Sequence, residues 1–295
     1  MDTIITEIKA SFRRGDVVTK FIYANVFIYL LITVVLVINR LFVRNAVSLV
    51  EIFALPASVS RILHQPWSLF TYMWMHVEIF HLFFNALWLY CFGKLFLRFF
   101  SAKHFVGTYV FSGLMGGLFY VVSYNLFPYF SGVLDYSTMV GASAAVLGLV
   151  AAVAYREPNY RIRLMFFGNV QLKWLALCFL ILDMCLVTSD NGGGHLSHLG
   201  GALGGFLFAL FLNRGVDITR WIVWIVDKIS SLFERKPRQP KMKVNYGSRA
   251  ADYEFNARRK ERDEEIDRIL DKIKLSGYES LTAAEKKTLF DVSRR

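Results

Sequence analysis

Residues 192–213 read GGGHLSHLGGALGGFLFALFLN, and this stretch decides which fold the sequence predicts. Its apolar part, 195–213, is close in length to the roughly 20 helical residues that cross a lipid bilayer. Glycines spaced four residues apart allow a neighbouring membrane helix to approach closely. This stretch contains two overlapping pairs of such glycines, Gly200 with Gly204 and Gly201 with Gly205. His195 and His198 stand at the start of this stretch, and because polar groups inside a membrane span are costly, both are candidates for function.

The whole chain has the composition of a membrane protein. It has 295 residues, of which 55% are hydrophobic and only 19% are charged, which is too apolar for an ordinary soluble domain. The candidate membrane spans are 20–42, 72–96, 104–127, 140–155, 171–188 and 195–213. The fourth is short, so we expect it to begin below the membrane surface. The sequence therefore predicts an all-α polytopic protein with a bundle of six transmembrane helices.

The chain has a net charge of +11, and the distribution of its basic residues along the sequence predicts the orientation of these spans. Basic residues are concentrated in the N-terminal segment and in the connectors after spans two and four, whereas the loops near 128–139 and 188–194 contain no Lys or Arg. The connector residues are Lys94, Arg98, Lys103, Arg156, Arg161 and Arg163. Because basic loops stay inside, we expect a multi-pass protein of the cell inner membrane with both termini cytoplasmic. No nucleic-acid-binding motif accompanies the charge, so we expect no nucleic-acid partner.

The predicted organisation has four parts. Residues 1–19 form a cytoplasmic N-terminal segment, and 20–214 form the six-helix core. Residues 215–235 are apolar but too short to cross a membrane, which favours an amphipathic helix in the interface. Residues 236–295 form a basic linker and a small soluble helical hairpin, in which Thr282 and Glu285 match a capping box. The hairpin is a candidate for binding a cytoplasmic partner.

Polar residues converge on the outer side of the membrane in this topology. Span two begins with His76, His81 and Asn85, span four with Ser143, and span six with the two histidines named above. A nucleophile and its base must share one depth, so this convergence predicts a serine nucleophile, Ser143, and a histidine base. Ser143 also lies at a helix N-terminus, where free backbone N–H groups and the helix dipole favour an oxyanion.

Each of these residues also has a simpler interpretation. Small residues around Ser143 are common where membrane helices pack, and a lone histidine is often a packing group. His81 and Asn85 stand four apart on one helix face, so both can donate to one oxyanion. Zinc chemistry is disfavoured because His76 and His81 do not form H-E-x-x-H, and a zinc site would also need His195 or His198. We expect a structural role for Asp183 in span five, rather than titration or gating.

Together these residues resemble the rhomboid family of intramembrane serine proteases. The resemblance is carried by Gly141-Ala142-Ser143-Ala144, by His198-Leu199-Gly200-Gly201, and by the polar residues of span two. It implies that Ser143 and His198 cleave transmembrane substrates as a dyad without a third acid, metal or ATP. His81, Asn85 and the Ser143 backbone would form the oxyanion site, with His76 in support.

The resemblance also carries expectations about packing, movement and partners. It implies close helix packing at Gly141, Gly201 and Gly205, and movement of span five and of a glycine cap at residues 192–194 to admit substrate. The expected partners are the lipid bilayer and single-span transmembrane substrates. A catalytically silent relative that binds transmembrane helices is the alternative, and a transporter is the third possibility.

Overall fold

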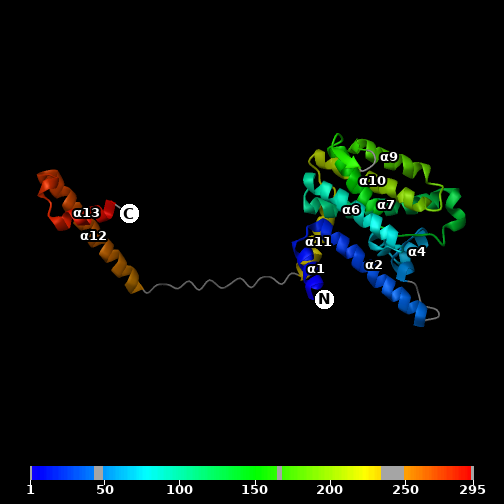
Figure 1. Ribbon diagram of the computed structural model, residues 1–295, viewed down its shortest axis with the longest axis horizontal. Coiled ribbons are helices and arrows are strands. Elements are labelled where there is room, and N and C mark those ends of the chain that lie inside the picture. Colours follow the sequence, from blue (N-terminus) through cyan, green and yellow to red (C-terminus); the bar gives the residue numbers. More distant parts are fainter. Residues whose placement is uncertain (1, 43–48, 165–167, 234–248, 294–295) are drawn as a thin grey trace. The chain divides into compact units, whose positions relative to one another are not determined.

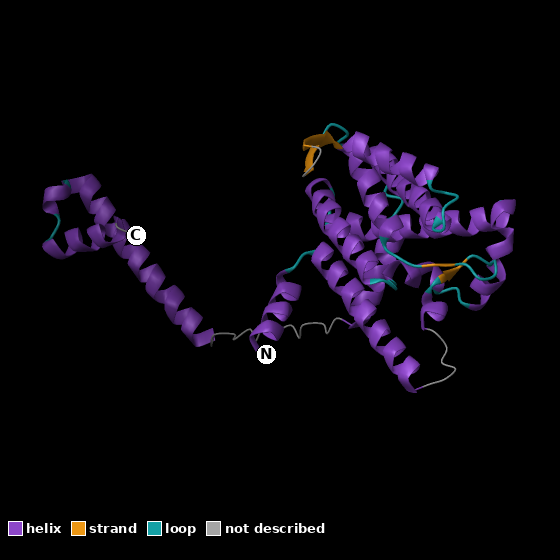
Figure 2. Ribbon diagram, turned by 45° about the vertical axis from the view of Figure 1, so that its right-hand side comes forward, coloured by secondary structure: helices purple, strands orange, loops and turns teal. Residues whose placement is uncertain are grey.

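The computed structural model describes residues 2–42, 49–164, 168–233 and 249–293. These belong to two compact units, Met1–Glu234 and Arg235–Arg295, which are considered separately. Both units are built mostly of helices (Figures 1 and 2). The predicted basic linker that follows residue 235 lies outside the described residues.

The first unit is a helical bundle with short helices in the loops between its longer helices. Its helices are α1 (Asp2–Arg14), α2 (Val17–Phe42), α3 (Leu49–Phe53), α4 (Val59–His64), α5 (Ser68–Thr71), η1 (Tyr72–Trp74), α6 (Ile79–Phe99), α7 (Ala102–Leu126), η2 (Pro128–Val133), α8 (Ser143–Arg156), α9 (Leu172–Cys185), α10 (Gly192–Asn213) and α11 (Arg220–Phe233). Within the described ranges, α2, α6, α7 and α10 are long and apolar enough to cross a membrane. The chain is therefore a multi-pass membrane protein.

Helices α8 and α9 have 14 residues each, which is shorter than a full span. At a rise of about 1.5 Å per residue, each extends only about 21 Å of the roughly 30 Å hydrocarbon thickness. The sequence predicted a short fourth span, but it predicted 18 residues for the fifth. The residues after Cys185 form turns instead of a further helical turn.

One other expectation about a helix end is wrong. The second span was expected to begin at residue 72, but α6 begins at Ile79, because the segment before it packs inside the protein. The Tyr72 hydroxyl donates to the Gly113 carbonyl at 2.6 Å, and the Tyr72 carbonyl accepts from the Gly141 N–H at 2.9 Å. The glycines at 192–194 form the first turn of α10, with Gly192 and Gly193 buried, and their movement as a cap stays a prediction.

Two short antiparallel strand pairs interrupt the helical fold, and the sequence did not predict them. β1 (Leu55–Pro56) pairs with β2 (Thr138–Met139), and β3 (Arg161–Leu164) pairs with β4 (Gly168–Gln171). Segments of two to four residues are too short to carry a recognisable period. The first pair ties the loop between α3 and α4 to the segment that leads into α8. Both pairs appear in orange in Figure 2.

Helix α10 packs closely against both α8 and α7. A side chain at Gly201 or Gly205 would collide with the backbone of Ala144 or Gly148 on α8. On the adjacent face, Gly200 and Gly204 leave room for α7. The G-x-x-x-G pairs thus let α10 approach two helices at once, and they fix the distance between α8 and α10.

Several basic residues lie at the end of the bundle where α6 ends and α7 begins. Lys94 at the end of α6 forms an ion pair of 2.8 Å with Asp16, which precedes α2. Arg98 donates to the Tyr160 hydroxyl at 2.7 Å. Helix α11 lies against α7, and Lys103 at the start of α7 pairs with Asp227 at 2.6 Å.

We predict that Gly205→Ala destabilises the bundle by about 1–3 kcal/mol, because the added methyl group overlaps the Gly148 backbone and forces α10 away from α8. Thermal unfolding in detergent measures the effect. Gly132→Ala is the matched control, since an added Cβ there meets no atom within 4 Å. Equal stability of the two variants would contradict the packing argument.

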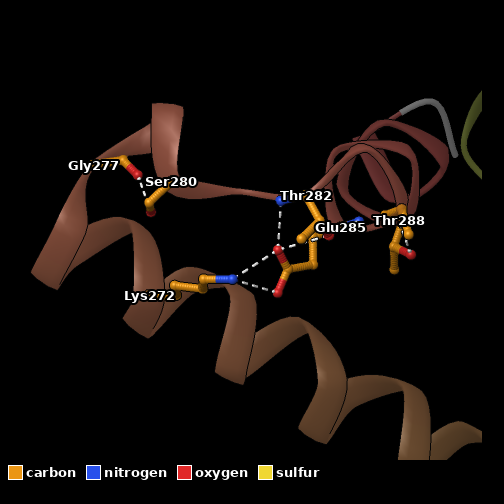
Figure 3. A network of polar contacts seen from close by, with 7 residues as sticks. Lys272, Gly277, Ser280, Thr282, Glu285 and Thr288 are labelled. Atoms are coloured by element: carbon orange, nitrogen blue, oxygen red, sulfur yellow. Dashed lines mark hydrogen bonds and ion pairs between the residues drawn. The ribbon is translucent and has the colours of Figure 1, made fainter.

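The second unit contains a helical hairpin, α12 (Arg249–Ser276) and α13 (Ala283–Ser293), joined through η3 (Tyr278–Ser280). Gly277 ends α12 with a φ of +75°, a conformation that favours glycine. The predicted capping box is present: the Thr282 N–H donates to Glu285 at 2.7 Å, and the Glu285 N–H donates to the Thr282 hydroxyl at 3.3 Å (Figure 3). Lys272 on α12 donates to both Glu285 oxygens at 2.9 Å.

These contacts make the hairpin sensitive to acid. The hydrogen bond from Lys272, followed by those from Thr282, lowers the pKa of Glu285 from 4.5 to about 2. A depressed pKa in the folded state stabilises the hairpin above the unfolded pKa, and this contribution disappears as the pH falls from 4.5 toward 2.

We predict that Glu285→Gln accelerates amide hydrogen exchange in α13 of the full-length protein at pH 7 severalfold, because the amide can still accept from the Thr282 N–H but loses the charge that binds Lys272 on α12. Glu265→Gln, on an exposed part of α12, removes the same charge and is expected to leave exchange unchanged. Identical exchange in both variants would show that the Glu285 contacts do not hold the hairpin.

Candidate active site

Ser143 and His198 lie in direct contact. Ser143 is the first residue of α8, and His198 lies in the second turn of α10. The Ser143 Oγ and the His198 Nε2 are 2.7 Å apart, which is a hydrogen-bond distance. The contact follows from the helix packing, because Gly201, three residues after His198, packs on Ala144, the residue after Ser143. Residues 55 positions apart in the chain are thereby joined.

Asp183 on α9 joins this pair through the other nitrogen of the His198 ring. Its Oδ1 lies 2.9 Å from the His198 Nδ1 and 2.8 Å from the His195 Nδ1, and the residue is only 7% exposed. An ionised carboxylate only accepts hydrogen bonds, so both Nδ1 atoms donate to it. In neutral His198 this leaves Nε2 free to accept the Ser143 proton. The resemblance implied no third acid, so this arrangement departs from that expectation.

The same three side chains are potential metal ligands. One ligand atom from each of Asp183, His195 and His198 lies within 4.8 Å of the others, the only such group among the described residues. Two imidazoles and a carboxylate suit zinc. However, binding through Nδ1 would break the hydrogen bonds to Asp183 and turn His198 away from its role as a base. His76 and His81 are not part of this group.

The polar residues of the second span divide between the site and its surroundings. Asn85 is buried, and its Nδ2 donates to the His81 carbonyl at 2.9 Å, which leaves the second amide proton available. The His81 ring lies over Gly141, whose φ of +124° marks a bend before α8. A Cβ added at Gly141 would meet the His81 ring, and the Gly141 N–H donates to the Tyr72 carbonyl of η1. His76 is buried beneath, with its ring centre 5.2 Å from that of His81.

Two cavities meet at Ser143 and His198. One, of about 290 Å³, lies between α6, α8, α9 and α10. Its apolar wall is formed by Phe84, Trp88, Val146, Leu147, Phe179, Leu182 and Leu186. The other, of about 690 Å³, also includes His81 and is lined by the loops that contain Ser137 and Asp190. Asn85 borders both cavities. The serine is thus reachable from an apolar side and from a polar side.

Comparison with known proteins agrees with this geometry. Fold and site together define a multi-pass membrane protein with a serine–histidine pair among its helices. Residues 63–215 match the Rhomboid domain, and the chain belongs to the rhomboid family. Residues 250–295 match a family of unknown function, DUF6576.

Several curated proteins are similar to this chain. Rhomboid-like protease 1 of Toxoplasma gondii is 27% identical over 169 residues, covering 54% of this chain and 52% of that protein. The mitochondrial Rhomboid protein 1 of Saccharomyces cerevisiae is 26% identical over 147 residues, covering 49% and 41%. The rhomboid protease GluP of Bacillus subtilis is 30% identical over 149 residues, covering 50% and 26%. The chain therefore spans about half or less of the length of these relatives.

We predict that a fluorophosphonate labels the protein in detergent at Ser143, because the hydrogen bond to His198 activates this hydroxyl. Peptide mapping by mass spectrometry identifies the labelled residue. His198→Ala should lower the labelling rate at least about 100-fold. Ser131→Ala, which changes an exposed serine in the outer loop, should label like the wild type. Labelling at another serine would contradict the assignment.

Proposed function

We propose that this protein is an intramembrane serine endopeptidase that hydrolyses peptide bonds of transmembrane substrates. The observation that carries the proposal is the 2.7 Å contact between the Ser143 Oγ and the His198 Nε2 at a site surrounded by membrane helices. The protease names of two of the relatives support the same class of reaction. The silent, helix-binding alternative gains no support from the site, because both reactive groups are in hydrogen-bond contact.

The reaction begins with attack of the Ser143 Oγ on the substrate carbonyl carbon while His198 takes the hydroxyl proton at Nε2. The carbonyl oxygen becomes an oxyanion. Its donors are the backbone N–H of Ser143, which has no helical acceptor at this position, and the second amide proton of Asn85. His81, in the same cavity, is a further donor.

The tetrahedral intermediate collapses when the C–N bond breaks and His198 returns its proton to the leaving amine. A water molecule then attacks the acyl-serine ester, with His198 again acting as the base. The two cavities suit these steps: the apolar one accommodates a substrate segment from the lipid, and the polar one admits water. The substrates proposed are single-span transmembrane proteins.

The proposed location is the cell inner membrane, with both termini cytoplasmic and the site toward the outside. Support comes from the basic end of the bundle, where Lys94, Arg98 and Arg156 lie, because positive residues stay inside. The serine lies at the other end of α8 from Arg156.

We predict that the wild type cleaves a single-span reporter in liposomes, whereas Ser143→Ala and His198→Ala lower kcat by at least about 10⁴-fold. His195→Ala should retain part of the activity, because it contacts Asp183 and not Ser143. Folding of each variant is checked by thermal unfolding. If the folded wild type neither cleaves several reporters nor reacts with a fluorophosphonate, the helix-binding function becomes the better account.

We also predict that Asn85→Ala lowers kcat about 100-fold with little change in KM, because it removes an oxyanion donor. Asn25→Ala on α2 is the matched control. Asn25 is also buried and donates to the carbonyl four residues earlier, Phe21, at 2.8 Å, but it is remote from Ser143. Equal losses in both variants would show that Asn85 only supports its helix.

A further inference from the structure

Asp183 is a buried acid that the Ser143–His198 mechanism does not use. Its position is unusual, because its Oδ1 accepts from the same ring whose other nitrogen contacts the nucleophile. Three helices supply the chain of contacts: α8 carries the serine, α10 the histidine and α9 the acid. On the assumption that the proposed function holds, we propose that Asp183 is a positioning residue that acts through His198, so that the site works as a Ser143–His198–Asp183 triad.

The first argument concerns the tautomer of His198. A base must have an unprotonated Nε2 facing the serine, and neutral imidazole carries its single proton on one nitrogen or the other. At 2.9 Å from Nδ1, the carboxylate oxygen accepts a proton there and has none to give. The contact therefore selects the tautomer that can accept the Ser143 proton, and it fixes the plane of the ring.

The second argument concerns charge. When His198 takes the serine proton it becomes an imidazolium, and Asp183 is the acid in hydrogen-bond contact with it. An adjacent carboxylate stabilises that cation, and the interaction is stronger where water is scarce. Asp183 is 7% exposed, and the His198 side chain is 23% exposed, so solvent screening is limited. The stabilisation develops with the tetrahedral intermediate and thus lowers the barrier.

The third argument concerns His195. A purely structural aspartate on α9 needs only one donor to tie α9 to α10, and the His195 Nδ1 supplies one at 2.8 Å. The second hydrogen bond, to His198, is not required for that purpose. The rings of the two histidines are nearly perpendicular, at 88°, and both direct Nδ1 at the same oxygen. His195 therefore holds the carboxylate in place while His198 uses it.

The experiment compares Asp183→Asn with the wild type in the reporter cleavage assay. Asparagine keeps the size of the side chain and removes its charge. Asp135→Asn is the matched control, because Asp135 is exposed in an outer loop and loses the same charge. We expect Asp183→Asn to lower kcat by about 10²–10⁴-fold with KM changed less than about threefold, and Asp135→Asn to resemble the wild type.

The outcomes separate the two proposals. If the wild type cleaves, Ser143→Ala does not, and Asp183→Asn stays within about threefold of the control, the triad is overturned and the serine protease function stands. If the wild type does not cleave at all, the proposed function itself fails. If activity depends on added zinc and is abolished by a chelator, the three side chains form a metal site, and the triad is again overturned.

A second measurement decides the matter even if Asp183→Asn does not fold. Nitrogen-15 NMR of histidine-labelled wild type in detergent reports which ring nitrogen of His198 carries the proton, with the signal assigned by its loss in His198→Ala. We expect a protonated Nδ1 with a downfield proton resonance. A neutral His198 protonated on Nε2 would overturn the proposal.

Discussion

The backbone contact between α8 and α10 is the constraint on which the site depends. Because Gly201 and Gly205 have no side chains, α10 reaches the main chain of α8 at Ala144 and Gly148. This close contact fixes the separation between Ser143, the first residue of α8, and His198 in the second turn of α10. A hydroxyl and an imidazole then meet at 2.7 Å without long side chains or flexible loops. The glycines contribute little hydrophobic energy, but they determine how accurately the two side chains are placed.

The second constraint is the cost of polar groups among membrane helices. The site meets it for its reactive groups by pairing them: Ser143 with His198, and both histidines with Asp183. The polar atoms gather at one end of the bundle, beside a cavity open to the outer loops. Basic residues and their partners occupy the other end. This separation lets the proposed hydrolytic site coexist with a lipid-facing surface.

Much of this could be predicted from sequence. Apolar length gave the helices, glycine spacing indicated the close helix pair, and spacing along the chain predicted the capping box at Thr282. The start of α6 could not be predicted, because residues 72–75 are apolar yet form the short 3-10 helix η1 and an extended residue, with the Tyr72 hydroxyl bonded to the Gly113 carbonyl. The partners of Asp183 could not be predicted either. They depend on the rotation of α9 about its axis, which a short and almost uniformly apolar helix does not reveal.

The central claim is that the chemistry occurs within the depth of the membrane, at the start of α8. The most direct test is to map, by mass spectrometry, the bond cleaved in a single-span reporter whose orientation in liposomes is known. The account predicts a cleaved bond inside the transmembrane segment, in its outer half, because Ser143 lies among membrane helices near the outer loops. A cut confined to the water-exposed part of the reporter, with the span intact, would contradict it.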